Sequence, residues 1–395
     1  MALVEHEVAV IGAGPAGLAV AAVLTQQGFS AVVVDKADAV GSAWRSHYER
    51  LRLHTERALS GLPGMPIPRK HGKWVPRAGV VEYLEEYARR HQLRLRLSTP
   101  VDQIERESAA WRLVTPSGPL TVAAVVIATG YNHTPHLPDW PGSISFAGEL
   151  IHSARYRTAA PFRGRDVLVV GTGNSGAEIA VDLADGGAGK VRVSVRTPPN
   201  ILRREVLGVS SQRLGVLLRH APVAIVDPIA SAVARLTVGD LTPYGLPPSP
   251  RGTYTRAKEG QIPILDVGFI DALKKGRVTV VPAVRSFAGP DVLLEGGGRI
   301  QPDAVIAATG YVRALERLVG HLGVLDGRGL PLVHGGATHP SAPGLHFIGF
   351  SNPISGNLRE IAFDARRIAK ALRAARLTAP PRAASFRHGA DPDGA

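Results

Sequence analysis

The chain has 395 residues, of which 45% are hydrophobic and 20% charged, as is typical of a globular protein with room for two or three domains. It contains no cysteine, which excludes disulfides, thiolate zinc sites and dithiol redox chemistry. The formal net charge is +13, with lysines and arginines spread along the chain, so the composition predicts a solvated basic surface and no nucleic-acid partner. The alternative is that this positive surface steers an anionic cofactor or an acidic substrate to the protein.

The first apolar strand begins within about ten residues of the N-terminus, which leaves no room for a signal peptide. Further along the sequence, no apolar run approaches the roughly 20 residues that a membrane-spanning helix needs. We therefore expect a cytoplasmic protein without a transmembrane segment.

An apolar run at Val8–Ile11 leads directly into the pattern G-x-G-x-x-G. In a nucleotide-binding unit the first glycine (Gly12) permits a tight turn, the second (Gly14) lets a pyrophosphate approach the backbone, and the third (Gly17) lets helix and strand pack closely. The next apolar strand ends in Asp35, at the spacing where an acid holds a ribose hydroxyl. An incidental glycine turn is the alternative, but it does not explain the ordered succession of strand, turn, helix, strand and acid.

Three more side chains in this region are candidates for the first nucleotide site. Lys36 follows the acid directly, and a glycine turn after Val40 is followed by Trp44 and Arg45. We expect the three side chains to lie along the ribose, phosphate or ring of the cofactor. The alternative for the turn is an ordinary loop with a packing tryptophan. The spacing of apolar residues then predicts an amphipathic helix over 79–91, and strands over 93–97 and 111–115 that form a small antiparallel sheet.

The glycine pattern occurs a second time, after the apolar run at 167–170. The residues of this second turn are Gly171, Gly173, Asn174, Ser175 and Gly176. Two dinucleotide sites in one chain indicate that electrons pass from one nucleotide cofactor to another.

The second unit differs from the first at the end of its second strand, where Arg196 stands in place of the acid. A carboxylate would repel a 2′-phosphate, whereas a guanidinium can hold it with two hydrogen bonds. The second site is therefore predicted to prefer NADPH to NADH, with Arg203 and Arg204 as nearby reserves. The alternative is a surface arginine at a strand end.

Two buried strands, over 122–131 and 304–311, end in the same four residues, Ala-Thr-Gly-Tyr. Strand ends of an open α/β sheet face the ligand crevice, and small residues there let the backbone approach a cofactor. We therefore place Thr129 and Gly130 at the first nucleotide and Thr309 and Gly310 at the second. The alternative is a pair of ordinary buried strands followed by glycine turns.

The segment between the two glycine turns matches F-x-G-x-x-x-H-x-x-x-Y, with Phe146, Gly148, His152 and Tyr156 at the defined positions. With the glycine turns and the two strand ends, it resembles the class B flavin monooxygenases. In its final tyrosine the motif resembles that of flavin-containing monooxygenases, including the plant YUCCA group. Baeyer–Villiger enzymes usually have tryptophan at this position. Further stretches similar to the YUCCA group are 52–54, 195–196, 202–208, 242–246, 263–268 and 364–369.

This resemblance implies an α/β fold with two Rossmann-like dinucleotide-binding domains, an FAD domain and an NADPH domain inserted into it. It implies FAD at the first site and NADPH at the second, hydride transfer to FAD, and reaction with O2 to give a C4a-(hydro)peroxyflavin. The partners would be a small organic substrate and O2. Because the flavin carries the chemistry, no metal and no protein nucleophile are expected.

Two departures from the family bear on the reaction. Many flavin-containing monooxygenases have an asparagine near the flavin where this chain has Leu53, His54 and Thr55, and YUCCA-like enzymes lack it too. The candidate catalytic side chains are therefore Thr55, His54 and His152, none of them certain. The resemblance implies that His152 positions the linker near the NADPH site, with a buried structural histidine as the alternative. Ser42 stands where a second glycine is common.

The expected domain layout follows from these motifs. The FAD-binding domain takes up residues 1–157 and 283–377, and the NADPH-binding domain takes up 158–282. A helical insertion at about 207–268, interrupted by Pro222 and Pro228, either covers a substrate cavity or forms an ordinary packed helical pair. A closing helix over 361–372 precedes a disordered tail at 378–395.

The leading hypothesis is an NADPH- and O2-dependent monooxygenase, and the YUCCA resemblance suggests oxidative decarboxylation of an aryl 2-oxo acid such as indole-3-pyruvate. N- or S-oxygenation of a soft nucleophile and Baeyer–Villiger oxidation are alternatives. A reductase that passes electrons from NAD(P)H through FAD to another protein, and a flavin-binding scaffold without activity, are more distant ones. A homo-oligomer is left open.

Overall fold

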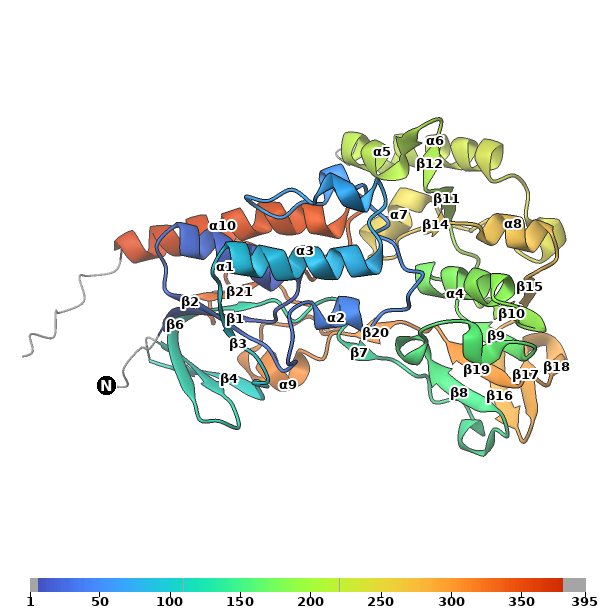
Figure 1. The fold of residues 1–395 in the computed structure, drawn as a ribbon, viewed down its shortest axis with the longest axis horizontal. Coiled ribbons are helices and arrows are strands. Elements are labelled where there is room, and N and C mark those ends of the chain that lie inside the picture. The colour runs from blue at the N-terminus through green and yellow to red at the C-terminus, as the bar shows by residue number, and fades with distance from the viewer. Residues whose placement is uncertain (1–5, 109, 220, 379–395) are drawn as a thin grey trace, which may run out of the picture.

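The structure is a computed structural model that describes residues 6–108, 110–219 and 221–378. Two large sheets, the first mixed and the second fully parallel, each with its own helices, form two domains that lie beside each other (Figure 1). The tail expected at 378–395 lies outside the described residues except for Thr378, which ends the last helix, α10 (Asn357–Thr378).

The first sheet has seven strands in the order β3-β2-β1-β6-β5-β4, and β21 pairs with the second half of β6. Its central strands run parallel, whereas β4, β5 and β6 pair antiparallel. The strands are β1 (His6–Ile11), β2 (Ala31–Val34), β3 (Arg94–Arg96), β4 (Gln103–Glu107), β5 (Ala110–Val114), β6 (Leu120–Ile127) and β21 (Leu345–Phe347).

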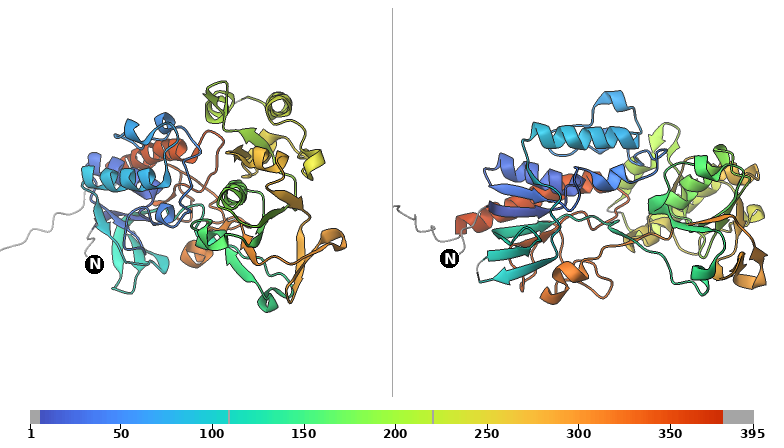
Figure 2. Two further views of the ribbon diagram at one scale, coloured as in Figure 1. Left: turned by 45° about the vertical axis from the view of Figure 1, so that its right-hand side comes forward. Right: turned by 60° about the horizontal axis from the view of Figure 1, so that its bottom comes forward.

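Alternation along β1 divides the core of this domain into two layers. Val8 and Val10 pack with helices α1 (Pro15–Gln26), α3 (Arg77–Arg90) and α10, while Ala9 and Ile11 pack on the opposite face. Successive side chains of a strand point to opposite faces, so a continuous apolar strand requires cover on both. The helices lie together on one side of the sheet (Figure 2). Strands β4 and β5 of the same sheet contribute side chains to the core on the other side.

The second sheet has five strands, all parallel, in the order β15-β10-β9-β19-β8. Helices α4 (Asn174–Asp185) and α8 (Phe269–Lys274) cover one face, and a three-stranded antiparallel sheet lies against the other. The strands are β8 (Glu149–His152), β9 (Asp166–Val170), β10 (Lys190–Ser194), β15 (Thr279–Val281) and β19 (Ala304–Ala307), with β16 (Val284–Ala288), β17 (Asp291–Leu294) and β18 (Arg299–Ile300) in the antiparallel sheet.

Strand pairing assigns three segments differently from the expectation. Strand β8 and residues 284–307 fall outside the expected NADPH domain of 158–282, but β8 and β19 pair within its sheet. Strand β3 pairs parallel with β2, so residues 93–97 extend the parallel sheet rather than the antiparallel one. In each case the partner strand lies far away in the sequence, where local apolar patterns carry no information about pairing.

The two domains are joined by a pair of crossing segments. Strand β7 (Thr134–Pro135) follows the first Ala-Thr-Gly-Tyr end and pairs antiparallel with β20 (Tyr311–Val312), which follows the second. The guanidinium of Arg313 lies 3.8 Å from the centre of the Tyr131 ring, across the same junction. The chain thus leaves and rejoins the first domain at one place, between the two sheets (Figure 1).

The insertion at 207–268 is helical, as the apolar pattern predicts. Its helices are α5 (Ser211–Leu218), α6 (Val223–Thr237) and α7 (Thr253–Lys258), and it also contains β13 (Val209–Ser210) and β14 (Ile264–Asp266). Pro222 precedes α6, whereas α6 continues through Pro228. Just before these helices, β11 (Ile201–Arg203) pairs with β14, and β12 (Glu205–Val206) pairs with β13. Two short helices, α2 (Ser42–Arg45) and α9 (Glu316–Val319), complete the first domain.

Candidate functional site

The first glycine turn connects β1 to α1 and lies against the end of β6. Gly12 has φ of +113°, and a Cβ there would collide with the carbonyl oxygen of Ala128. A Cβ on Gly17 would collide with the carbonyl of Gly12, whereas one on Gly14 would meet nothing within 4 Å. The outer glycines are therefore required by the protein's own packing, and the middle one leaves open space at the N-terminus of α1, where free N–H groups attract a phosphate.

The second glycine turn, between β9 and α4, repeats this arrangement. Gly171 has φ of +104°, and a Cβ there would lie 2.6 Å from the carbonyl oxygen of Ala308. A Cβ on Gly176 would collide with the carbonyl of Gly171, and one on Gly173 would meet nothing within 4 Å. Each Ala-Thr-Gly strand end is thus packed against a glycine turn, which explains why the same small residues occur twice.

The acid after β2 is held beside the first turn. Asp35 accepts hydrogen bonds from the backbone N–H groups of Ala13 (2.5 Å) and Ala37 (2.8 Å), one on each carboxylate oxygen. Each oxygen retains a lone pair for a ribose hydroxyl. The Lys36 ammonium instead faces the ring of His133, with Nζ and Nε2 3.2 Å apart.

Trp44 and Arg45 of α2 are engaged by the protein. The partly buried side chain of Trp44 packs against the hydrophobic cores of both domains, so its indole connects the two domains. Arg45 forms an ion pair with Glu85 of α3 and donates to the carbonyl oxygen of Val40. Packing and ion pairing account for both side chains without a cofactor.

The two strand-end threonines differ in their hydrogen bonding. The Thr129 hydroxyl is buried and has no hydrogen-bond partner within the described part of the chain. The Thr309 hydroxyl donates to the carbonyl oxygen of His136. A buried hydroxyl is rarely left unpaired, so Thr129 marks the first turn as a place where a polar ligand group fits.

Arg196 is exposed just beyond β10 and has neither a hydrogen bond nor an ion pair within residues 6–108, 110–219 and 221–378. Arg203 is already engaged, because its guanidinium pairs with the buried carboxylate of Asp266 at 2.8 Å. Arg196 is thus available to an anion at the second turn, and Arg203 is not.

Asn174 and Ser175 stand at the start of α4, and the Asn174 amide bonds to other protein groups. The Asn174 amide donates to the carbonyl oxygen of Pro263 and accepts from the backbone N–H of Leu265. Asn174 therefore fastens β14 to the second turn, and its side chain is not aimed at a cofactor.

The linker motif positions the second strand end. His152 Nδ1 accepts from the backbone N–H of Ala154, and Nε2 lies 3.0 Å from the carbonyl oxygen of Gly310. Since a carbonyl can only accept, the proton is on Nε2 and the ring is neutral. Burial lowers the pKa of His152, although the bond to Gly310 acts in the opposite direction. His152 therefore holds Gly310 in place.

The other linker residues anchor the segment. Phe146 packs edge-on against Phe287, with ring centres 5.1 Å apart, and a Cβ on Gly148 would collide with the Phe146 ring. Tyr156 is buried, donates to Asp182 of α4 at 2.6 Å, and has a pKa raised by burial. The motif is thus a packing device that fixes β8 and α4.

Two functional contacts were missed by sequence reasoning, because they join segments more than 120 residues apart. The carboxylate of Glu178, in α4, faces His54 and also accepts a hydrogen bond of 3.1 Å from Tyr48. Glu178 is only 4% exposed. The signal that could have found it is a charged residue on the apolar face of α4, since a buried carboxylate requires partners.

Thr55 lies where the FAD domain meets the insertion. The Thr55 hydroxyl is 2.8 Å from the Ser60 hydroxyl. The Thr55 methyl group lies close to Gly356, where a Cβ added to the glycine would come near it. The neighbouring Glu56 is held by Arg213 of α5 at 2.8 Å and by the side chain of Gln212. Helix α5 therefore covers the loop that carries His54 and Thr55.

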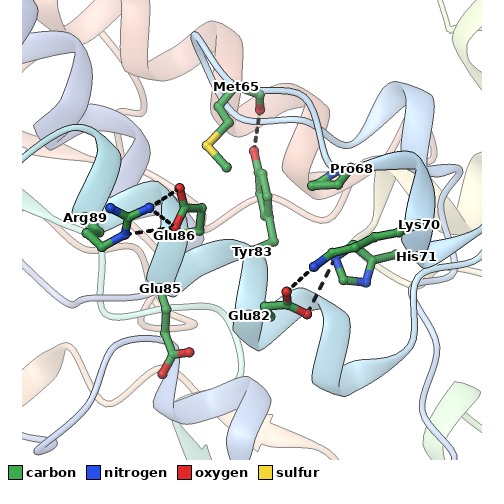
Figure 3. Close-up of a pocket in the computed structure, with 9 residues that line it drawn as sticks. All are labelled: Met65, Pro68, Lys70, His71, Glu82, Tyr83, Glu85, Glu86 and Arg89. Atoms are coloured by element: carbon green, nitrogen blue, oxygen red, sulfur yellow. Dashed lines mark hydrogen bonds and ion pairs between the residues drawn. The ribbon is translucent and has the colours of Figure 1, made fainter.

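Two pockets open on the surface near this loop. One, of about 340 Å³, lies on the outer face of α3, where Lys70 pairs with Glu82 and Glu86 with Arg89 (Figure 3). The third acid of its lining, Glu85, pairs with Arg45 outside the pocket, and the lining contains none of the glycine-turn or linker-motif residues. The other, of about 390 Å³, is lined mainly by basic side chains: Arg57, Arg69, Lys73 and Arg213, with the acid Glu56 and with Ala58 and Gly72.

Two features are absent from the described residues. None of the helices they form is both long and apolar enough to cross a membrane. Likewise, they contain no group of three or more histidine, aspartate or glutamate side chains placed to hold a metal ion.

Comparison with known proteins places the chain in a family. A model described as pyridine nucleotide-disulphide oxidoreductase matches residues 9–225, more than half of the chain. The probable indole-3-pyruvate monooxygenase YUCCA8 of Arabidopsis thaliana is 35% identical over 315 residues, which cover 76% of this chain and 74% of that protein. The indole-3-pyruvate monooxygenase YUCCA1 of Oryza sativa is 37% identical over 308 residues and 76% of each chain.

Solved structures agree. A flavin-containing monooxygenase from Stenotrophomonas maltophilia matches with a TM-score of 0.70 and 25% identity, over 92% of this chain and 98% of that one. A cyclohexanone monooxygenase matches in fold, with a TM-score of 0.72 at 20% identity over 94% and 88% of the two chains. The chain therefore belongs to the class B flavin monooxygenases, in the group that includes the YUCCA proteins, within the pyridine nucleotide-disulphide oxidoreductase family.

Proposed function

We propose that this monooxygenase binds FAD at the first glycine turn and NADPH at the second, and that it converts an aryl 2-oxo acid, such as indole-3-pyruvate, into the acid one carbon shorter. The overall reaction consumes the 2-oxo acid, O2, NADPH and H⁺. It yields the shortened acid, CO2, NADP⁺ and water. One oxygen atom of O2 enters the acid and the other leaves as water. The names of the relatives at 35–37% identity support this substrate class.

The observation that carries the proposal is the pair of equivalent open turns. Gly14 and Gly173 each leave space at a helix N-terminus, next to matching strand ends that are joined through β7 and β20. Two nucleotides bound at these turns would extend toward one junction between the domains. A single dinucleotide site would explain neither the repetition nor the pairing of the two exits.

The residues at the first turn suit FAD. The amide groups of α1 face the open space at Gly14, Asp35 is fixed beside the turn, and the buried hydroxyl of Thr129 has no partner among the described residues. Phosphate, ribose and flavin groups are the partners that such a set requires. Bound FAD, once reduced, supplies the electrons that activate O2.

The residues at the second turn suit NADPH. Gly173 leaves room for the pyrophosphate, and the exposed guanidinium of Arg196 is placed beyond the neighbouring strand for a 2′-phosphate. His152 keeps the Gly310 backbone in position beside this turn. The neutral ring of His152 offers no acid at ordinary pH, so its part is to position the backbone rather than to move a proton.

Isotope labelling tests the proposal. Purified protein loaded with FAD is supplied with NADPH, indole-3-pyruvate and ¹⁸O2, and the products are analysed by mass spectrometry. We expect indole-3-acetate that carries one ¹⁸O atom in its carboxylate, formed in equal amount to the NADPH consumed. Hydrogen peroxide without labelled acid would identify an NADPH oxidase or reductase. Label in an amine or sulfide added in parallel, and none in the acid, would favour heteroatom oxygenation.

A further inference from the structure

The guanidinium of Arg204 is placed differently from that of its neighbour Arg203. It follows β11 and lies over the indole ring of Trp74, 4.3 Å from the ring centre. Arg204 is half-buried and has no carboxylate partner in the part of the chain that the structure describes, whereas Arg203 is paired with Asp266. A half-buried arginine that is stacked but lacks an ion-pair partner is ready to bind an anion from outside the protein.

The position of Trp74 brings Arg204 to the candidate site. Trp74 precedes Val75, whose carbonyl accepts the backbone N–H of Leu53 at 2.7 Å, directly before His54. The charge of Glu178, the partner of His54, acts on Arg204, and burial lowers the arginine's pKa. Arg204 therefore approaches the His54 loop from the NADPH domain.

Glu178 does not neutralise this guanidinium. Its carboxylate is taken up by His54 and Tyr48, and no hydrogen bond or ion pair joins it to Arg204 in the described residues. The next acid along the chain, Glu205, pairs with Lys73 at 2.7 Å. The acids around Arg204 are thus engaged, and its positive charge remains for a ligand.

The surroundings of this loop add positive charge. Lys73 lies 5.4 Å from the centre of the Trp74 ring, and it also lines the basic pocket next to Glu56. Arg57, Arg69 and Arg213 line the same pocket, so four cations surround a single acid. A field of this sign raises the local concentration of anionic ligands and speeds their arrival.

We propose that Arg204, held flat by Trp74, binds the carboxylate of the substrate and so makes this monooxygenase select organic acids over neutral amines, sulfides and ketones. This inference rests on the proposed function for the identity of the reaction. A phosphate of NADPH has the same anionic chemistry, so the experiment must separate the two ligands. Arg204 is a specificity-determining residue that acts on the group next to the reacting carbonyl.

Kinetics with an acid and its neutral ester separate these ligands. Indole-3-pyruvate as substrate and its methyl ester as competitive inhibitor, since the ester has no carboxylate to lose as CO2, are compared in the wild type, Arg204→Gln, Arg204→Lys and the control Arg90→Gln, which removes an exposed arginine at the far end of α3. We expect Arg204→Gln to raise the KM for the acid about 10–100-fold and the inhibition constant of the ester less than about threefold, since one charge-assisted pair is lost. Arg204→Lys should recover part of the acid preference, and Arg90→Gln should keep it.

Two results would overturn the inference. If Arg204→Gln raises the KM for NADPH and leaves the acid-to-ester ratio as in the wild type, the anion is a phosphate of the coenzyme. If it weakens the binding of acid and ester equally, the role of Arg204 is only structural. Trp74→Phe should keep the acid preference and Trp74→Ala should weaken it, because only the latter loses the stacking surface.

Equilibrium binding separates failure of this inference from failure of the proposed function. Indole-3-propionate, an acid without the oxo group, is titrated into the FAD-loaded protein by calorimetry. Loss of about tenfold or more in affinity on Arg204→Gln supports the carboxylate site even if no labelled product forms. Labelled product together with unchanged affinity in Arg204→Gln would overturn this inference and leave the proposed function standing.

Discussion

His54, in the loop that follows α2, faces Glu178, four residues into α4 beyond the second glycine turn. Glu178 is 4% exposed and accepts a second hydrogen bond from Tyr48. Both partners belong to the first domain's loop, whereas the carboxylate belongs to the second domain. One buried acid therefore fastens the loop with His54 and Thr55 to the helix behind the second glycine turn.

Replacing this acid tests that role. Glu178→Ala leaves the buried Tyr48 hydroxyl and the His54 ring without a partner, so we expect the free energy of unfolding to fall by about 2–4 kcal/mol. Glu178→Gln keeps one acceptor for Tyr48, so it should lower the free energy of unfolding by only about 1 kcal/mol. Urea unfolding followed by tryptophan fluorescence measures both. Equal and small losses in the two variants would mean that the contact contributes little to joining the domains.

The glycines of the first turn should respond differently to alanine. Gly14→Ala adds a Cβ in open space, so we expect unchanged stability without FAD and an affinity for FAD lower by about tenfold or more. Gly12→Ala forces alanine into φ of +113° against Ala128 and should cost about 1–3 kcal/mol even without cofactor. Thermal unfolding of the apoprotein and FAD titration distinguish them. A stability loss in Gly14→Ala as large as that in Gly12→Ala would show that Gly14 serves packing.

Arg196 should decide between the two nicotinamide coenzymes. Arg196→Gln removes the free guanidinium beyond β10, and we expect the KM for NADPH to rise about 10–100-fold while that for NADH changes little. The rate of flavin bleaching under anaerobic conditions measures both coenzymes. The exposed Arg90→Gln variant controls for lost positive charge. A parallel rise for NADPH and NADH would assign Arg196 to something other than the 2′-phosphate.

His47 makes stability depend on pH. Burial, helped by the charge of Arg157, lowers its pKa to about 4, against 6.5 in the unfolded chain. Between these values the unfolded state binds a proton and the folded state does not, so stability is full above pH 6.5 and falls as the pH drops toward 4. We expect the lowered pKa of His47 alone to reduce the free energy of unfolding by roughly 2 kcal/mol when the pH falls to 4.5.

His47→Asn should flatten that part of the pH profile, measured as the urea midpoint between pH 7.5 and 4.5. His321→Asn removes an exposed histidine and serves as the control. His152 and His346 also have pKa values lowered by burial, so some acid sensitivity should remain in His47→Asn. Identical profiles for wild type and His47→Asn would contradict the prediction.

Local patterns were enough to predict the α/β fold and the family. A glycine turn is specified within six residues, because φ near +110° at Gly12 and Gly171 and the close approach at Gly17 and Gly176 are properties of the backbone itself. The strand ends at Thr129 and Thr309 follow from the same turns, since each is packed against one of them. The assignment of Arg196 to the 2′-phosphate stays a prediction, supported by its lack of a partner in the described chain.

Tertiary structure alone decided how the segments between these turns are used. Sheet pairing moved β8 and β19 into the second domain, and folding brought His54 to Glu178 across 124 residues and Arg204 to Trp74. It also engaged Arg203, Asn174 and Arg45 with protein partners. Sequence determines a turn because the turn's atoms are neighbours along the chain. A buried ion pair or a stacked guanidinium depends instead on which distant surfaces meet, and these surfaces meet only when the whole core packs.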